Sequence, residues 1–138
     1  MMQTAQQQNG RAATCLIVED STFDSEKMKR VVRRALRRVT VEVASDLRTA
    51  RHTLKRADPA LILLDNNLPD GLGADFAQEL ARDPRLSAIP VIMVSDWPSP
   101  FMWEKAASAG VAYVLNKAEF DGRYVVAALQ GKRESRMN

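Results

Sequence analysis

LILLDNNLPDGLG, residues 61–73, is the stretch of sequence that decides the fold. Four apolar residues are followed at once by an acidic residue, Asp65, and then by asparagine, proline, aspartate and glycine residues that are typical of a turn. An apolar run this short indicates a strand that is buried on both faces, as in a parallel sheet covered by helices. Asp65 then stands at the carboxyl end of that strand.

The same arrangement recurs along the chain, where short apolar runs alternate with longer amphipathic segments. In the longer segments the apolar residues are spaced three and four apart, which indicates helices. We predict strands at residues 14–18, 41–44, 60–64, 90–94 and 111–115, and helices at residues 26–39, 47–55, 74–81, 101–109 and 120–129. Ser21 or Thr22 can cap the first helix.

Five strand–helix units in strict alternation predict parallel strands joined by right-handed crossovers. The fold class is therefore α/β, an open sandwich with helices on both faces of the sheet. Sheets of this kind bind their ligands at the carboxyl ends of the strands.

The composition is that of a globular protein, with 138 residues, 46% of them hydrophobic and 27% charged. We predict one domain at residues 13–131, between disordered tails at residues 1–12 and 132–138. No apolar run is long enough to cross a bilayer, so we expect no membrane association. The single cysteine, Cys15, cannot form an internal disulfide, and it favours an inert core thiol and a cytoplasmic location.

Polar residues follow four of the predicted strands. Glu19 and Asp20 follow the first strand, Asp65 the third, Ser95 the fourth and Lys117 the fifth. These side chains should therefore converge at one edge of the sheet. Clustered carboxylates need a cation, and hard oxygen ligands favour Mg²⁺. Lysine and serine side chains could bind further anionic oxygens. With an aspartate as nucleophile, this set of residues indicates transfer of a phosphoryl group to the aspartate.

Each of these residues has an ordinary structural interpretation when it is taken alone. A Glu-Asp pair after a strand is commonly a solvated turn or a helix cap, and Asp65 could be a turn residue. The functional interpretation depends on the agreement of all four strand ends.

Four segments resemble the signature segments of response-regulator receiver domains, and they occur in the order of that family. The segments are CLIVEDS (15–21), LILLDNNLPDGLG (61–73), IPVIMVSDW (89–97) and AGVAYVLNKAEF (109–120). The spacings also match, with 45 residues from Asp20 to Asp65, 30 more to Ser95 and 22 more to Lys117. The resemblance implies a flavodoxin-like three-layer (βα)5 sandwich with its five parallel strands in the order 2-1-3-4-5.

The resemblance also implies a function. Asp65 would be the phospho-acceptor, and Asp20 and Asp65 would bind Mg²⁺ directly with the backbone carbonyl of Asn67, while Glu19 would act through a metal-bound water. The chain would be a stand-alone response regulator rather than an enzyme. It would receive its phosphoryl group from a sensor histidine kinase or a histidine phosphotransferase and signal to a downstream protein target, with homodimer formation as a further option.

The phosphoryl group itself would be bound by Ser95 and Lys117. Many family members carry an aromatic residue three positions before the lysine, which swings inward during switching. That position is Val114 here, and Tyr113 precedes it. Because neighbouring strand residues point to opposite faces, Tyr113 cannot substitute, and we expect switching without an aromatic rotation.

The lysine is usually followed by a proline with a cis peptide bond, but Ala118 follows it here. A cis bond to a residue other than proline costs about 2.5–4 kcal/mol. We therefore expect either a trans bond with a shifted loop or a strained cis bond.

Three residues near the site occupy positions expected to tune the lifetime of the phosphoryl group. Asp96 stands where the family usually has a small residue, so it adds bulk and negative charge. By resemblance, Asn67 and Trp97 control how fast water attacks the acyl phosphate, and we expect Trp97 to cover part of the site.

The first predicted helix is strongly basic opposite its apolar side. Such a run is either a solvated face or a docking surface, because the first helix of this family commonly meets the histidine-bearing bundle of a kinase. A partner with an acidic face would fit. No basic groove with interleaved aromatic residues is visible, so we do not expect nucleic acid as a partner. The candidate docking residues are Lys27, Arg30, Arg33, Arg34 and Arg37.

Two other functions remain open. A Mg²⁺-dependent phosphatase of the haloacid-dehalogenase kind would also form an aspartyl phosphate, but it needs a general acid two residues after the nucleophile, where this chain has Asn67. A receiver-like interaction module that is never phosphorylated is the other alternative, and Val114, Asp96 and Ala118 favour it.

Overall fold

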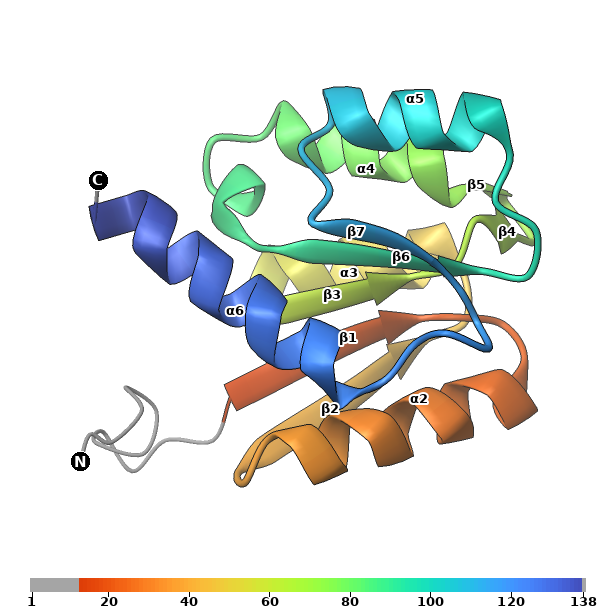
Figure 1. Cartoon of the computed structure of the whole chain (residues 1–138). Helices are drawn as coiled ribbons and strands as arrows, with labels where there is room; N and C mark the ends of the chain where they lie inside the picture. The colour runs from red at the N-terminus through yellow and green to blue at the C-terminus, as the bar shows by residue number, and fades with distance from the viewer. Residues whose placement is uncertain (1–12, 138) are drawn as a thin grey trace.

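The computed structural model describes residues 13–137, so the predicted N-terminal tail at residues 1–12 lies outside the described residues. Five parallel strands form one sheet in the order β2-β1-β3-β6-β7. Helices α2 and α6 cover one face of this sheet, and α3, α4 and α5 cover the other (Figure 1). The predicted three-layer sandwich and its strand order are confirmed.

The sheet strands are β1 (Ala13–Val18), β2 (Val39–Ala44), β3 (Leu61–Leu64), β6 (Val91–Ser95) and β7 (Tyr113–Asn116). The helices are α2 (Thr22–Ala35), α3 (Leu47–Arg56), α4 (Gly73–Ala81), α5 (Pro100–Ser108) and α6 (Gly122–Met137), with a short 3-10 turn at Leu86–Ala88. A small antiparallel hairpin, β4 (Asn67–Leu68) and β5 (Gly71–Leu72), follows β3 and was not predicted.

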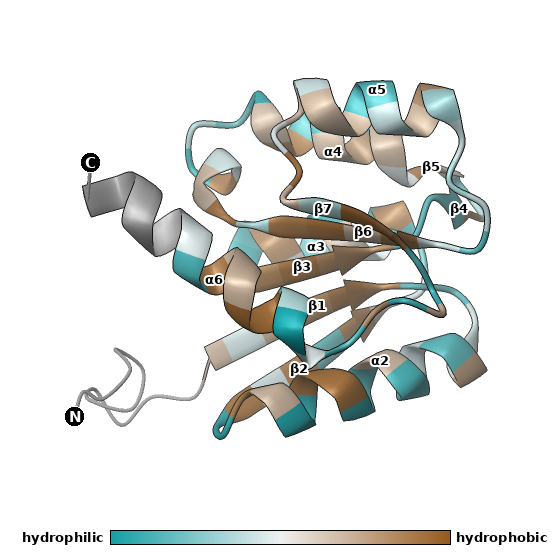
Figure 2. Ribbon diagram, viewed as in Figure 1, coloured by the Kyte–Doolittle hydropathy of each residue, from teal (hydrophilic) through white to brown (hydrophobic). Residues whose placement is uncertain are grey.

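The core consists of two apolar layers, one on each face of the sheet. Along β1, Leu16 and Val18 pack on the side of α3, α4 and α5, whereas Cys15 and Ile17 pack on the side of α2 and α6. Figure 2 shows the apolar strands lying between helices whose outer surfaces are more polar. The thiol of Cys15 is fully buried, and burial raises its pKa to about 12, which agrees with an inert core residue.

Helix α2 begins after Ser21, one of the two predicted caps, and it begins and ends four residues earlier than the periodic segment at residues 26–39. The hydroxyl of Ser21 accepts a hydrogen bond from the Asp24 backbone N–H at 3.2 Å, and this N-cap starts the helix at Thr22. At the other end Leu36 is extended, and Val39 pairs with Ala13 in the sheet. The prediction that the helix reaches residue 39 was therefore wrong, because pairing in the sheet prevailed over the apolar periodicity.

Helix α6 is longer than predicted. We expected it to end at residue 129, with a disordered tail at residues 132–138, but the helix continues to Met137. The residues after Gly131 are lysine, arginine, glutamate, serine and methionine, most of which favour helix. Within residues 13–137, no helix has the length and apolar character that crossing a membrane requires.

The turn after β3 is held by backbone contacts that leave no space for a side chain at Gly73. The Gly73 N–H donates to the Asn66 carbonyl at 2.7 Å, and the Asn66 side-chain oxygen accepts from the Ala74 N–H at 2.9 Å. A β-carbon on Gly73 would lie 3.0 Å from the Asn66 α-carbon and would overlap the carbonyl oxygen of Asp65. The start of α4 thus fixes the backbone of Asp65.

Substitution Gly73→Ala should lower the free energy of unfolding by about 2–4 kcal/mol, because the clash is with backbone and cannot be relieved by a rotamer change. Gly131→Ala is the matched control, since a β-carbon there meets nothing within 4 Å and alanine favours helix. Urea unfolding of both variants measures the difference. A Gly73→Ala variant as stable as Gly131→Ala would contradict this description of the turn.

Candidate functional site

The polar residues that follow the strands meet at one edge of the sheet, on the right-hand side of Figure 1. Hydrogen bonds between neighbouring strands continue one residue past the strand ends. The Asp65 N–H donates to the Val18 carbonyl at 3.0 Å, and the Lys117 N–H donates to the Ser95 carbonyl at 3.0 Å. The parallel ladder therefore fixes the positions at which these side chains leave the backbone.

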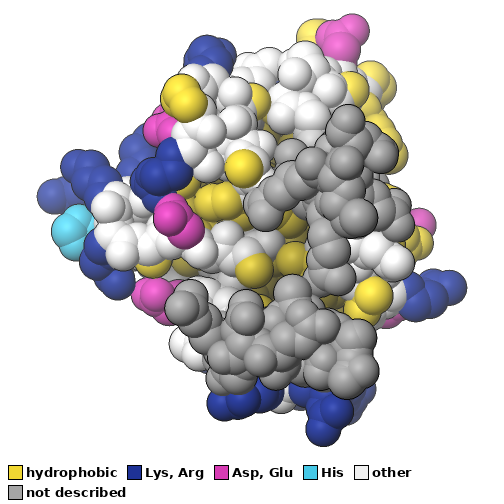
Figure 3. Space-filling model, turned by 90° about the vertical axis from the view of Figure 1, so that its left-hand side faces the viewer, with side chains coloured by type: hydrophobic (Ala, Val, Ile, Leu, Met, Phe, Trp, Pro, Cys, Tyr) yellow, Lys and Arg dark blue, Asp and Glu magenta, His cyan; other side chains and the backbone are white. Residues whose placement is uncertain are grey.

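Three carboxylates form a tight cluster at this edge. One oxygen from each of Glu19, Asp20 and Asp65 lies within 4.8 Å of the other two. Glu19 and Asp65 are 2% and 4% exposed, whereas Asp20 is exposed to solvent. At the opposite edge of the sheet, where the strands begin, the acidic side chains visible in Figure 3 are scattered singly and form no such cluster. The predicted convergence of the three acids is confirmed.

The ammonium of Lys117 lies among four carboxylates. Its Nζ atom is 2.7 Å from Asp24 Oδ2 and 3.0 Å from Glu19 Oε1. It is 3.9 Å from Asp65 Oδ1 and 3.8 Å from Asp96 Oδ2. The sequence predicted correctly that Lys117 lies at this edge, but Asp24 was not among the predicted site residues.

Burial and crowding make Asp65 an unusual aspartate. Desolvation raises the pKa of its carboxyl, and the nearby Glu19 charge raises it further, so that it reaches about 7 in spite of the opposing Lys117 charge. Burial likewise raises the pKa of Glu19. Burial alone would lower the pKa of Lys117, but its ion pairs with Asp24 and Glu19 prevail and raise it. The Lys117 side chain therefore keeps its positive charge at neutral pH.

The acidic cluster fits a divalent cation. The oxygen Oε2 of Glu19 accepts a hydrogen bond from the Ser21 N–H at 3.0 Å, but the buried Oε1 makes an ion pair with Lys117 and no hydrogen bond. Carboxylate oxygens are the hard ligands that Mg²⁺ prefers, and an exposed Asp20 leaves a route for entry. Asn67 begins β4 two residues after Asp65, and the role of its carbonyl as a ligand stays a prediction.

Comparison with known proteins identifies the family. Residues 15–130 match the sequence profile described as Response regulator receiver domain. The chain belongs to this family. The match covers the whole sheet from Cys15 onward and every residue of the acidic cluster, so the family assignment and the geometry concern the same part of the molecule.

Similar curated proteins share only part of their length with this receiver domain. The transcriptional regulatory protein DpiA of Escherichia coli K12 is 41% identical over 69 residues, which make up 50% of this chain and 30% of DpiA. A protein-glutamate methylesterase/protein-glutamine glutaminase of Photorhabdus laumondii is 32% identical over 82 residues, which make up 59% of this chain and 23% of that protein.

Solved structures agree with the fold. The CheY-like receiver domain protein from Methanospirillum hungatei JF-1 has a TM-score of 0.77 and 20% identity, covering 90% of this chain and 98% of the other. The chemotaxis response regulator CheY4 of Vibrio cholerae has a TM-score of 0.67 and 24% identity, covering 88% and 98%. At this identity the likeness concerns the fold alone.

The position of the usual switch aromatic is apolar and buried in this receiver domain. Val114 is 8% exposed and packs in the core layer on the side of α3, α4 and α5. Tyr113 points to the other layer, where its ring makes an edge-on contact with Tyr124 at 5.2 Å between centroids. Tyr113 thus faces away from the Val114 side, as predicted, and the absence of an aromatic rotation during switching stays a prediction.

The loop that carries Lys117 is held without a cis peptide bond. No peptide bond in the described part of the chain is cis, so the bond between Lys117 and Ala118 is trans and not a strained cis bond. The side chain of Asn116 fixes the loop instead. Its Oδ1 accepts from the Ala118 N–H at 2.8 Å, and its Nδ2 donates to the Asp96 carbonyl at 3.0 Å.

The tuning positions differ in how close they come to the site. The Asp96 carboxylate lies 3.8 Å from Lys117 Nζ, so this residue adds negative charge near the site, as predicted. The Trp97 side chain is 86% exposed, so in this structure it shields little of the buried Asp65. Ser95 is fully buried, and its hydroxyl accepts a hydrogen bond from the Trp97 N–H at 3.3 Å. The effects of these residues on phosphoryl lifetime stay predictions.

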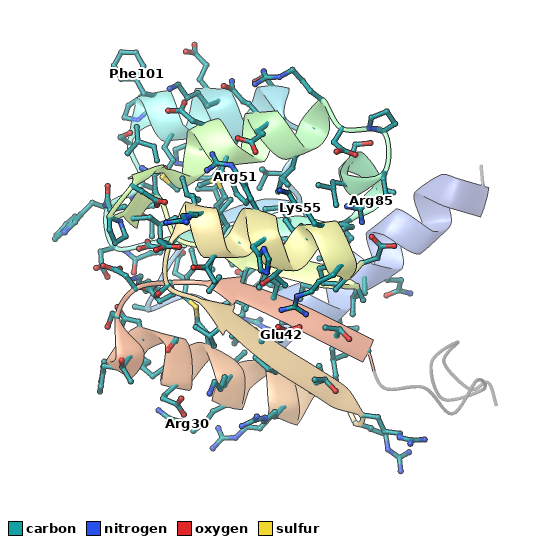
Figure 4. All side chains as sticks on the ribbon, turned by 180° about the vertical axis from the view of Figure 1, so that it is seen from behind. Arg30, Glu42, Arg51, Lys55, Arg85 and Phe101 are labelled. Carbon is teal, nitrogen blue, oxygen red and sulfur yellow. The ribbon has the colours of Figure 1, made fainter. Side chains whose placement is uncertain are left out.

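The candidate docking residues lie on the solvent side of α2, with one correction. Lys27, Arg30, Arg33 and Arg34 are exposed on the helix, and Figure 4 shows Arg30 projecting away from the sheet. Arg37 is exposed as well, but it lies in the turn after α2 and not on the helix.

Asp65→Asn should stabilise the protein in the absence of divalent cations, and the gain should grow with pH. The raised pKa of Asp65 means that the folded state keeps a proton that the unfolded chain has lost between about pH 4 and pH 7. Relative to high pH, the raised pKa of Asp65 therefore stabilises the folded state fully below pH 4. This stabilisation is lost as the pH rises to 7, and above pH 7 the buried charge of Asp65 lowers the free energy of unfolding. An amide removes the penalty, by on the order of 1–3 kcal/mol at pH 8.

Urea unfolding of both proteins at several pH values in EDTA measures this difference. Glu104→Gln is the control, because Glu104 is exposed on α5 and its side chain has no hydrogen bond or ion pair among the described residues. A gain from Asp65→Asn that is absent at pH 8, or that is equal at pH 4 and pH 8, would show that Asp65 does not carry a destabilising buried charge.

Proposed function

We propose that this receiver domain accepts a phosphoryl group on Asp65 from a phosphohistidine of a sensor histidine kinase or a histidine phosphotransferase. One observation carries the proposal. A buried carboxylate, Asp65, lies within a cluster of acids and 3.9 Å from a lysine ammonium, at the edge of the sheet where ligands bind in open α/β folds. The membership of the chain in the receiver family supports the same assignment.

The reaction is a displacement at phosphorus. An oxygen of the Asp65 carboxylate attacks, the phosphorus–nitrogen bond of the phosphohistidine breaks, and the imidazole leaves with the electron pair and takes up a proton. The product is an acyl phosphate with one more negative charge than the free carboxylate. Burial raises the pKa of Asp65 in the cation-free protein, and a bound cation would oppose this shift and favour the ionised carboxylate that attacks.

The residues around Asp65 would stabilise the transferred group. Lys117 would pair with one phosphoryl oxygen, and the Ser95 hydroxyl would donate a hydrogen bond to another. Asp20, Asp65 and the Asn67 carbonyl would hold Mg²⁺, with Glu19 acting through a metal-bound water. When bound, the cation would neutralise negative charge on the carboxylates and the phosphoryl oxygens.

The output would be protein–protein contacts rather than catalysis on a second substrate. The basic side of α2 would dock the phosphodonor protein. The surface of α5 and β7 would meet a downstream target, and three exposed aromatic residues support this placement. They are Trp97, Phe101 and Trp103, of which Phe101 projects outward from α5 in Figure 4. Aromatic side chains contribute strongly to protein interfaces.

Incubation with acetyl phosphate and Mg²⁺, followed by intact mass measurement, tests the proposed function. The chain should gain the mass of one phosphoryl group, and EDTA should prevent the gain. Asp65→Asn should abolish the adduct. Asp58→Asn should keep it, because Asp58 is an exposed aspartate before β3 that pairs with Arg85 and not with the site. Release of phosphate without an adduct would favour a phosphatase, and an unmodified chain would favour a phosphorylation-independent interaction module; either outcome would overturn the proposal.

A further inference from the structure

Lys117 is held closer to helix α2 than to the proposed phospho-acceptor. Its Nζ atom donates a hydrogen bond to Asp24 Oδ2 at 2.7 Å, and Asp65 Oδ1 lies at 3.9 Å, which is too far for a hydrogen bond. The side chains of Lys117 and Asp24 are 13% and 25% exposed, so solvent screens this ion pair less than one on the open surface.

The start of α2 explains why Asp24 reaches Lys117. Ser21 caps the helix, and its hydroxyl accepts from the backbone N–H of Asp24, which fixes that residue in the first turn. The positive end of the helix dipole stabilises a negative charge at this position. Asp24 is therefore a preorganised carboxylate that lies beside the site but belongs to a different element from the strand-end acids.

The nearest contacts of Lys117 lie away from the Asp65 carboxylate. Its ammonium has three N–H donors, and its two nearest neighbours are the carboxylates of Asp24 and Glu19. To bind an oxygen on phosphorylated Asp65, the ammonium has to move toward the acceptor. A small cavity of about 30 Å³, lined by Asp24, Lys27, Lys117 and apolar side chains, borders the lysine on the α2 side.

We propose that Asp24 is a positioning residue that competes with the phosphoryl group for Lys117. In the unmodified protein it draws the ammonium toward α2, and phosphorylation of Asp65 has to draw it back. Asp24 thereby opposes phosphorylation and shifts the receiver toward its unmodified state. This inference rests on the proposed function, because it assumes that Lys117 binds the phosphoryl group.

Asp24→Asn should increase the affinity for beryllofluoride, a phosphoryl mimic, in the presence of Mg²⁺. Asparagine keeps the size of the side chain but removes the charge that holds the ammonium. We expect binding about fivefold tighter than wild type by isothermal titration calorimetry. Glu26→Gln is the matched control, because Glu26 lies on the same helix and pairs with Lys29 at 2.8 Å instead of Lys117; its affinity should equal that of wild type.

Two further variants separate positioning from a general effect of charge or folding. Asp24→Glu restores the carboxylate and should return the affinity to near the wild-type value. In a Lys117→Gln background, which itself binds more weakly, Asp24→Asn should have no further effect if it acts through the lysine. A gain of the same size in that background would mean direct repulsion between Asp24 and the mimic, and would overturn the proposal.

The remaining outcomes distinguish this inference from the proposed function. If the wild-type protein binds beryllofluoride and Asp24→Asn binds it equally well or more weakly, the role of Asp24 is overturned. The assignment of Asp65 as phospho-acceptor would remain intact. Failure of the folded wild-type protein to bind beryllofluoride or to be phosphorylated would overturn both.

Discussion

The ion-pair network around Lys117 is the interaction on which the site depends. Two carboxylates, Glu19 and Asp65, are almost fully buried, and a buried charge without a partner is strongly unfavourable. The lysine supplies one positive charge for Glu19, Asp24, Asp65 and Asp96 together. The site is thus left with excess negative charge. Burial of Asp65, together with this charge, raises the pKa of its carboxyl, and the excess charge explains the fit of the cluster to a divalent cation.

The positions of these charged residues are set by backbone geometry, by the loop after β7 and by the apolar core. The parallel ladder sets where Asp65 and Lys117 leave the sheet, and the close approach of Gly73 to the turn fixes the backbone after β3. The side chain of Asn116 holds the loop after β7. An apolar core on both faces makes the sheet rigid, so that charges brought to its edge cannot relax apart.

The strands and four strand-end positions can be predicted from the residues themselves, because a short apolar run followed by a polar residue is a local pattern. The strand order is implied by the resemblance to receiver domains and not by that pattern. Asp24 could not be found in this way. It is brought to the site by the first turn of α2, which follows the Ser21 cap and precedes the segment of apolar periodicity at residues 26–39. A cap candidate shows where a helix can begin, but it does not show which neighbouring element the first turn contacts. A local preference at the helix N-cap thus determined a site residue, whereas pairing of Val39 in the sheet ends the helix before Arg37. The exposure of Trp97 depends on loop conformation, which has no periodic pattern to reveal it.

The central claim is that the charge arrangement singles out one of the aspartates as the phospho-acceptor. Borohydride reduces an aspartyl phosphate to homoserine, so treatment of the acetyl-phosphate-modified chain followed by peptide mass spectrometry locates the acceptor directly. The account predicts homoserine at position 65 and at no other aspartate, including Asp20 and Asp24. Homoserine at any of the other positions, or its absence from position 65 in a modified chain, would contradict it.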